Sequence, residues 1–181
     1  MFAPSRLSVL REYVELLQRS FADSPDVKVR QLDLAHLAED GVPRRSFDTV
    51  VCSNLLEHIE EDGAALAGMR DVLIPGGRVV LIVPALQSLY GSIDRAIHHH
   101  QRYSRDGLVR ELERAGLAVE HVSYFNMLGV PGWFLNAPIL KRRAVPGIQA
   151  RINDWLVPLL PLERRFGPPV GMSLLAVARA T

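Results

Sequence analysis

The stretch "FDTVVCSNLLEHIEEDGAALAGMRDVLIPGGRVVLIVP" (residues 47–84) contains two apolar runs on either side of an amphipathic segment. The runs "FDTVVCS" (47–53) and "RVVLIVP" (78–84) are short and β-branched, which is typical of strands buried on both faces of a sheet. In the segment between them, at 62–73, apolar residues recur at helical spacing, and the following Pro-Gly-Gly stops the helix. This order predicts two parallel strands joined by a crossover helix.

Polar side chains follow the first of these strands. Asn54, Glu57 and His58 come where the strand gives way to the helix, and ligands bind outside the carboxyl ends of strands in open α/β sheets. Two structural interpretations stay open beside a role in binding: Asn54 is also a good helix cap, and Glu57 would complement the dipole of the helix. The residues alone predict a ligand cleft and no particular reaction.

The rest of the chain repeats the alternation of helix and strand. The further elements expected are helices at 7–21 and 104–116, a Pro-broken helical stretch at 151–169, and strands at 27–34, 117–125 and 172–180. This recurring order predicts a single α/β domain over residues 1–181, with helices packed around a mostly parallel sheet.

Composition excludes several classes of protein. The chain has 181 residues and a formal net charge of +1, so nothing predicts bulk binding of nucleic acid. The single cysteine, Cys52, lies within an apolar run, which indicates a buried small side chain rather than a nucleophile. One cysteine fits a reducing compartment, and the first residues lack the layout of a secretory signal. We therefore expect a cytoplasmic protein.

The uncharged segment "VSYFNMLGVPGWFLNAPIL" (122–140) is long enough to raise the question of a transmembrane helix. It also contains two prolines, two asparagines and two glycines, which break the helix that spanning a membrane requires. We expect no membrane span here. The segment is interpreted as the wall of a pocket, or as a surface that contacts a lipid-like substrate.

One acidic residue ends the strand predicted before this region. Asp33 is either a solvated turn residue or an acceptor for the exocyclic amine of a purine. The stretch "VRQLDL" (29–34), followed by "FD.V.....LEH" and then "L.PGG.....VP" within 47–84, closely resembles the class I S-adenosylmethionine-dependent methyltransferases. The resemblance covers about residues 10–125 well and the later residues more loosely.

The resemblance implies a Rossmann-like methyltransferase sandwich that closes with a C-terminal antiparallel hairpin. It also implies S-adenosylmethionine as the cofactor and methyl transfer to a small-molecule acceptor, by our interpretation at oxygen. Some residues match positions that contact the cofactor in the family: the adenine-binding carboxylate and its neighbour, the loop that lines the cofactor, and the "EH" pair. They are, in that order, Asp33 and Leu34, Asn54 and Leu55, and Glu57 and His58.

The sequence departs from the family at its front. The family has a Gly-rich loop after its first strand, and an acidic residue at the end of its second strand binds the ribose. In this sequence no Gly-x-Gly occurs before residues 47–84, and Ser8 stands at the position of the acidic residue. We therefore expect an N-terminally truncated version of the fold, without the first two strands. In the family these strands lie between the strands at 27–34 and 47–53, so without them the strand at 47–53 has an exposed edge. We expect one of three outcomes: pairing between the strands at 27–34 and 47–53, a displaced N-terminal segment, or self-association through that edge.

The substrate side of such enzymes follows the strand that ends in Val-Pro, and here it reads "ALQSLYGSIDRAIHHHQRYSRDGL" (85–108). Asp94 and His98 stand four apart, so on a helix they share a face, and His98 is a candidate general base for removing a proton from a hydroxyl. Three consecutive histidines rarely converge on one ion, so we expect no metal site in the run. A solvated or structural run stays open as the alternative to catalysis.

The acceptor is not defined by these residues. With Trp133 and Phe134 in the apolar segment, we expect a lipid-linked or sugar-containing small molecule. A competing hypothesis is a non-catalytic remnant of the fold that acts in binding. A nucleotide-binding oxidoreductase is disfavoured because the chain has no G-x-G-x-x-G motif.

Overall fold

The computed structural model describes residues 4–37, 40–142, 144, 147 and 167–181, in two compact units, Met1–Asp33 and Leu34–Thr181. The N-terminal unit contains the expected first helix, α1 (Pro4–Ser20). A hydrogen bond from Gln18 Nε2 to the carbonyl oxygen of Val29, at 3.3 Å, holds the chain that follows against this helix.

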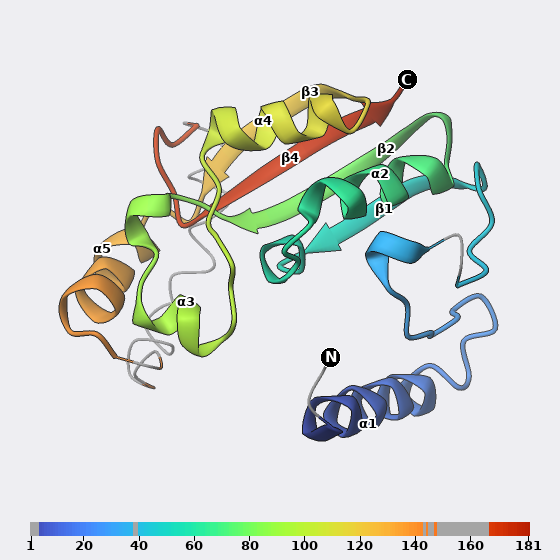
Figure 1. Ribbon diagram of the computed structural model, residues 1–181, viewed down its shortest axis with the longest axis horizontal. Coiled ribbons are helices and arrows are strands. Elements are labelled where there is room, and N and C mark those ends of the chain that lie inside the picture. Colours follow the sequence, from blue (N-terminus) through green and yellow to red (C-terminus); the bar gives the residue numbers. More distant parts are fainter. Residues whose placement is uncertain (1–3, 38–39, 143, 145–146, 148–166) are drawn as a thin grey trace. The chain divides into compact units, whose positions relative to one another are not determined.

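The larger unit is built on a four-stranded sheet with the strand order β1-β2-β4-β3 (Figure 1). Its strands are β1 (Phe47–Ser53), β2 (Leu73–Pro84), β3 (Leu117–Phe125) and β4 (Ser173–Ala180). The parallel pairing of β1 with β2 confirms the strand–helix–strand prediction. Strand β4 lies between β2 and β3 and runs antiparallel to both, so the closing antiparallel pair is confirmed. Since β2 and β3 both run antiparallel to β4, three of the four described strands point the same way, and β4 makes the sheet mixed.

Two helices cover one face of this sheet, as Figure 1 shows: α2 (Asp62–Val72) and α4 (Arg105–Arg114). Their apolar side chains join those of the strands in one buried core, whose largest fully buried members include Leu66, Met69, Leu108 and Leu112. Ser104 is the N-cap of α4, because its hydroxyl accepts a hydrogen bond from the N–H of Gly107 at 3.1 Å.

The strand predicted at 27–34 does not form. Residues 27–33 have no regular secondary structure, and Leu34–His36 is a turn of 3-10 helix, η1. An alternating segment becomes a strand only when its backbone finds a partner, and within the described residues no strand pairs with this one. Strand β1 is therefore an edge of the described sheet, as expected. Self-association through that edge stays a prediction.

Short elements complete the larger unit. They are η2 (Leu56–His58), η3 (Gln87–Leu89), α3 (Ser92–Ala96), α5 (Gly129–Phe134) and η4 (Leu135–Ile139). The uncharged segment 122–140 is thus divided between the end of β3 and two short helices, and no helix in the described part of the chain could cross a membrane. Most of the helix predicted at 151–169 lies outside the described residues.

Candidate functional site

Two loops meet at the carboxyl ends of β1 and β2. Because these strands are parallel, the first loop (residues 54–61) and the second loop (residues 85–104) leave the same edge of the sheet. The N–H of His100 in the second loop donates to the carbonyl oxygen of Glu57 in the first, at 2.8 Å. Both loops therefore lie at the carboxyl ends of the strands, where a cleft was expected.

Asn54 begins the first loop in a left-handed backbone conformation, with φ of +49°. Its N–H donates to the carbonyl oxygen of Ile82 at 2.8 Å, and its Nδ2 lies 3.3 Å from the hydroxyl of Ser53. The N-cap residue of α2 is Glu61, so the interpretation of Asn54 as the cap of that helix is wrong. Asn54 and the following Leu55 are both exposed.

Glu57 lies in η2 with its side chain only 1% exposed. Neither of its carboxylate oxygens has a hydrogen-bond partner among the described residues. Burial raises the pKa of Glu57, although the charges of His99 and Arg102 act in the opposite direction. The residue precedes α2, so its interpretation as a complement to the dipole of that helix is wrong.

The imidazole of His58 is fixed by one hydrogen bond to the second loop. Its Nδ1 lies 3.2 Å from the carbonyl oxygen of His98. A carbonyl can only accept, so Nδ1 carries the hydrogen and Nε2 has the lone pair in the neutral ring. Burial and the neighbouring His99 lower the pKa of His58, which keeps the ring neutral near pH 7.

Asp94 does not share a helical face with His98. Helix α3 ends at Ala96, and His98 has a φ of +63°, so the four-residue spacing has no helix to act through. The carboxylate of Asp94 instead lies 3.2 Å from Nδ1 of His99. It also accepts from the N–H of Gly91 at 2.9 Å.

Arg102 is the second side-chain partner of Asp94, after His99, and the side chains of Arg102 and Asp94 are both buried. The Arg102 Nε donates to the Asp94 carboxylate at 2.7 Å, and another guanidinium N–H donates to the carbonyl oxygen of Ala85 at 3.1 Å. The guanidinium carbon lies 4.5 Å from the ring centroid of Trp133, a cation–π distance. The first two contacts hold the second loop together, and the third joins it to α5.

Three side chains from the two loops converge. The ligand atoms of Glu57, His58 and His99 lie within 4.8 Å of one another, and the two imidazole rings meet edge to face with their centroids 4.7 Å apart. Of the three consecutive histidines, only His99 belongs to this group. Its Nε2 lies 3.7 Å from the nearer carboxylate oxygen of Glu57.

The remaining predicted site residues lie at the junction of the two units. Asp33 is the last residue of the N-terminal unit, and Leu34 is the first of the larger one. The side chain of Leu34 packs against the hydrophobic core of the larger unit. Binding of adenine by Asp33 stays a prediction, as do the catalytic role of His98 and the cofactor contacts of the first loop.

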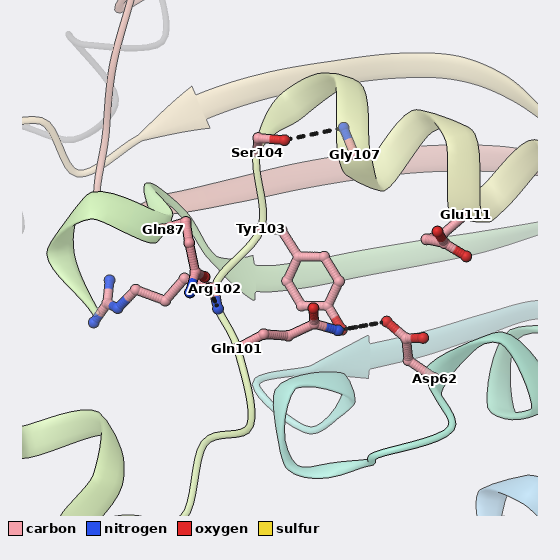
Figure 2. A pocket seen from close by; sticks show the side chains of 8 residues that line it. All are labelled: Asp62, Gln87, Gln101, Arg102, Tyr103, Ser104, Gly107 and Glu111. Carbon is pink, nitrogen blue, oxygen red and sulfur yellow. Dashed lines mark hydrogen bonds between the residues drawn. The ribbon is translucent and has the colours of Figure 1, made fainter. Parts of the chain in front are cut away.

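A polar pocket of about 340 Å³ opens beside the second loop, between the first turns of α2 and α4 (Figure 2). The hydroxyl of Tyr103 lies 2.9 Å from the carboxylate of Asp62, and Gln101 Nε2 donates to the same carboxylate at 2.8 Å. Figure 2 shows these side chains directed toward one another. The floor of the pocket thus also fastens the second loop to α2.

The sequence did not identify the roles of His99 and Arg102. Their partners are the buried carboxylates of Asp94 and Glu57, and the contact between Glu57 and His99 joins separate loops. Neither the periodicity of a helix nor that of a strand predicts that residues on two separate loops lie close together.

Cys52 is expected to be chemically inert in the folded protein. Its side chain is buried, and burial together with the nearby carboxylate of Glu57 raises its pKa to about 11. Such a thiol is about 0.1% thiolate at about pH 8. We expect Ellman's reagent to label the native chain at least ~10²-fold more slowly than the chain in guanidinium chloride. Equal rates would show an accessible thiol and revive the nucleophile hypothesis.

Comparison with known proteins supports the family that the sequence motifs indicate. A family model described as "Methyltransferase domain" matches residues 8–122, which is more than half of the chain. In fold, the chain is similar to an S-adenosylmethionine-dependent methyltransferase from Mesorhizobium loti, with a TM-score of 0.57 and 20% identity. That likeness covers 91% of this chain and 76% of the other.

Two curated relatives are ubiquinone biosynthesis O-methyltransferases. The protein from Paracidovorax citrulli is 26% identical over 93 residues, which are 45% of this chain and 38% of that protein. The protein from Xanthomonas euvesicatoria is 29% identical over 113 residues, 55% of this chain and 46% of that protein. The matched region therefore spans less than half of the length of either relative. With the family model matched over residues 8–122 and the α/β fold shared with methyltransferase structures, the chain belongs to the family of S-adenosylmethionine-dependent methyltransferase domains.

Proposed function

We propose that the chain takes part in methyl transfer from S-adenosylmethionine to an oxygen atom of a small-molecule acceptor. The observation that carries the proposal is the contact between the two loops at the carboxyl ends of β1 and β2. The first loop contains the residues expected to contact the cofactor, and the second contains those expected on the acceptor side. Their contact would bring the methyl group and the acceptor together at the carboxyl ends of these two strands.

We assign the cofactor contacts as follows. The exposed Asn54 and Leu55 would line the cofactor, and the left-handed backbone at Asn54 turns the chain there. Asp33 would accept a hydrogen bond from the adenine amine, with Leu34 beside it. Glu57 is buried, so its proposed part is to shape the loop from beneath, together with His58, rather than to touch the cofactor.

The sulfonium of the cofactor already makes its methyl group a good electrophile, so the protein has to orient the acceptor and accept its proton. We assign the proton to His98, whose side chain is exposed on the second loop. Asp94 holds His99 and Arg102 in place, so its proposed role is to position the second loop. With His98 as the base, the acceptor group can be a hydroxyl, which loses its proton as the methyl group is transferred.

Two observations support the choice of acceptor. The O-methyltransferase relatives match this chain only in part and distantly, and they favour oxygen as the methylated atom. A group of exposed apolar side chains in segment 122–140 favours an acceptor with a lipid-like part, as in a lipid-linked sugar. They are Met127, Leu128, Phe134, Leu135, Ile139 and Leu140.

The test uses the chain preceded by a strand and Gly-rich loop taken from a solved relative, because the 181 residues alone are expected to bind the cofactor too weakly for useful turnover. This protein is supplied with S-adenosylmethionine that has a trideuterated methyl group and with the small-molecule fraction of a bacterial extract. We expect mass spectrometry to find products with the label on oxygen. His98→Gln should lower the rate by ~10²-fold, whereas His100→Gln, in the same exposed run, should change it little. Label on nitrogen or carbon would contradict O-methylation. No transfer under saturating cofactor would favour a non-catalytic binding domain.

A further inference from the structure

The buried carboxylate of Glu57 lacks a hydrogen-bond donor among the described residues. It is 1% exposed, and neither oxygen has a hydrogen-bond partner in the described part of the chain. A buried carboxylate without a hydrogen-bond donor is costly, because it has given up its hydrogen bonds to water without replacing them. Its nearest cationic candidate is Nε2 of His99 at 3.7 Å, which is beyond hydrogen-bonding distance.

Both neighbouring imidazoles are oriented in the same way. His58 uses Nδ1 to bind the carbonyl oxygen of His98 at 3.2 Å, and His99 uses Nδ1 to bind the carboxylate of Asp94 at 3.2 Å. Each acceptor oxygen places the hydrogen on Nδ1, which leaves the lone pair on Nε2. Histidines that bind metal ions are held in this way, by a carbonyl or carboxylate at the other ring nitrogen.

We propose that Glu57, His58 and His99 form a binding site for a divalent first-row transition-metal ion, with Zn²⁺ as the best fit. Two imidazole nitrogens and one carboxylate oxygen are the ligand set of many catalytic zinc sites, and they leave a fourth position open to an external oxygen. Imidazole ligands favour Zn²⁺, Co²⁺ or Fe²⁺ over Mg²⁺ and Ca²⁺, which prefer oxygen. The site goes beyond the proposed function, because it binds a metal whether or not methyl transfer occurs.

The geometry is close to what an ion needs. Ligand atoms at about 2.0–2.1 Å from a tetrahedral ion lie roughly 3.4 Å apart, and the oxygen of Glu57 and Nε2 of His99 lie 3.7 Å apart. One ring nitrogen of each histidine and one carboxylate oxygen of Glu57 lie within 4.8 Å of one another, and an inward movement of the three side chains would close them around an ion. The sequence prediction of no metal site rested on three consecutive histidines, of which this site uses one.

A buried ion pair is the competing account of the same residues. If His99 carries a second proton, its imidazolium would neutralise Glu57 without any metal. The two accounts differ in His58: a metal site uses its Nε2, whereas an ion pair between Glu57 and His99 does not. They also differ in whether an added ion stabilises the fold.

The experiment uses the 181-residue chain without a polyhistidine tag, stripped with a chelator, and Co²⁺ or Zn²⁺ as the probe. We expect one equivalent of Zn²⁺ to bind with a dissociation constant on the order of 10⁻⁶ M or below, and Co²⁺ to give visible absorption bands. Glu57→Gln, His58→Gln and His99→Gln should each weaken binding by at least ~10-fold. His100→Gln and His121→Gln, which change histidines outside the site, should leave affinity unchanged, and Mg²⁺ should not compete.

A second measurement does not depend on the variants folding. In the unaltered chain, Zn²⁺ should shift the Nε2 resonances of two histidines in ¹⁵N spectra and raise the melting temperature. Binding weaker than about millimolar, or binding that Glu57→Gln and His58→Gln leave intact, would overturn the proposal. Because neither assay contains cofactor or acceptor, a failure of the metal site is distinguishable from a failure of the methyl-transfer proposal.

Discussion

S-Adenosylmethionine is expected to bind the 181-residue chain with a dissociation constant in about the millimolar range, roughly 10²- to 10⁴-fold above that of a relative with micromolar affinity. The chain contains no Gly-x-Gly, and Ser8 stands where the family has the carboxylate that binds the ribose. Charged hydrogen bonds of this kind contribute ~1.5–3 kcal/mol each. The loss of two or more amounts to ~3–6 kcal/mol, at ~1.4 kcal/mol per tenfold change.

Calorimetry with S-adenosylhomocysteine measures this affinity without turnover. The matched control is the same chain preceded by a strand and Gly-rich loop taken from a solved relative, which should bind in the micromolar range. Micromolar binding by the 181 residues alone would contradict the expectation. It would mean that a second copy of the chain, or a different arrangement of residues 1–33, supplies the contacts.

Replacing Arg102 by Met is expected to destabilise the protein by ~3–5 kcal/mol. The change leaves the carboxylate of Asp94, which is fully buried, without its guanidinium partner. The cost of an uncompensated buried charge dominates over the net value of the pair. Adding Asp94→Asn in the same chain should recover part of the loss, because the unpaired charge then disappears.

The measurement is chemical denaturation, with Arg110→Met as the control, since Arg110 is exposed on α4 and should change stability by no more than ~0.5 kcal/mol. Burial alone would raise the pKa of Asp94, but hydrogen bonds from His99, Gly91 and Arg102 and the charge of Arg102 together lower it. Its contribution to stability is therefore present above the pKa of an unfolded Asp and is lost as the pH falls through the lower, folded value. The difference between wild type and Arg102→Met should narrow at acid pH; a constant difference would contradict this role.

The parallel pairing of β1 with β2 could be predicted because its signals are local. Both strands contain short apolar, β-branched runs, and the helix between them has its own periodicity and stop signal. The segment 27–34 has an equally plausible alternating pattern, but a strand also needs a neighbour, and that requirement cannot be read from the segment itself. The position of β4 between β2 and β3 is likewise a non-local property, because it depends on pairing between residues far apart in the sequence.

The candidate site shows the same division. Both loops were located from the ends of the predicted strands, because topology places the carboxyl ends of parallel strands together. The pairing of Asp94 with His98 failed because it assumed that a helix continued past Ala96, whereas the chain turns and presents His99 instead. The approach of Glu57 to His99 depends on how two loops pack, so no spacing in the sequence could reveal it.

The claim on which this account depends is that the cofactor binds at the carboxyl ends of β1 and β2, where the first and second loops meet. Titration of the ¹⁵N-labelled 181-residue chain with S-adenosylhomocysteine, followed by NMR to several millimolar, tests it even when binding is weak. We expect saturable shifts of the amide resonances of Asn54, Leu55 and their neighbours in the first loop, with smaller shifts in the second. Saturable shifts confined to other parts of the chain, or no saturable shifts in the first loop, would contradict the account.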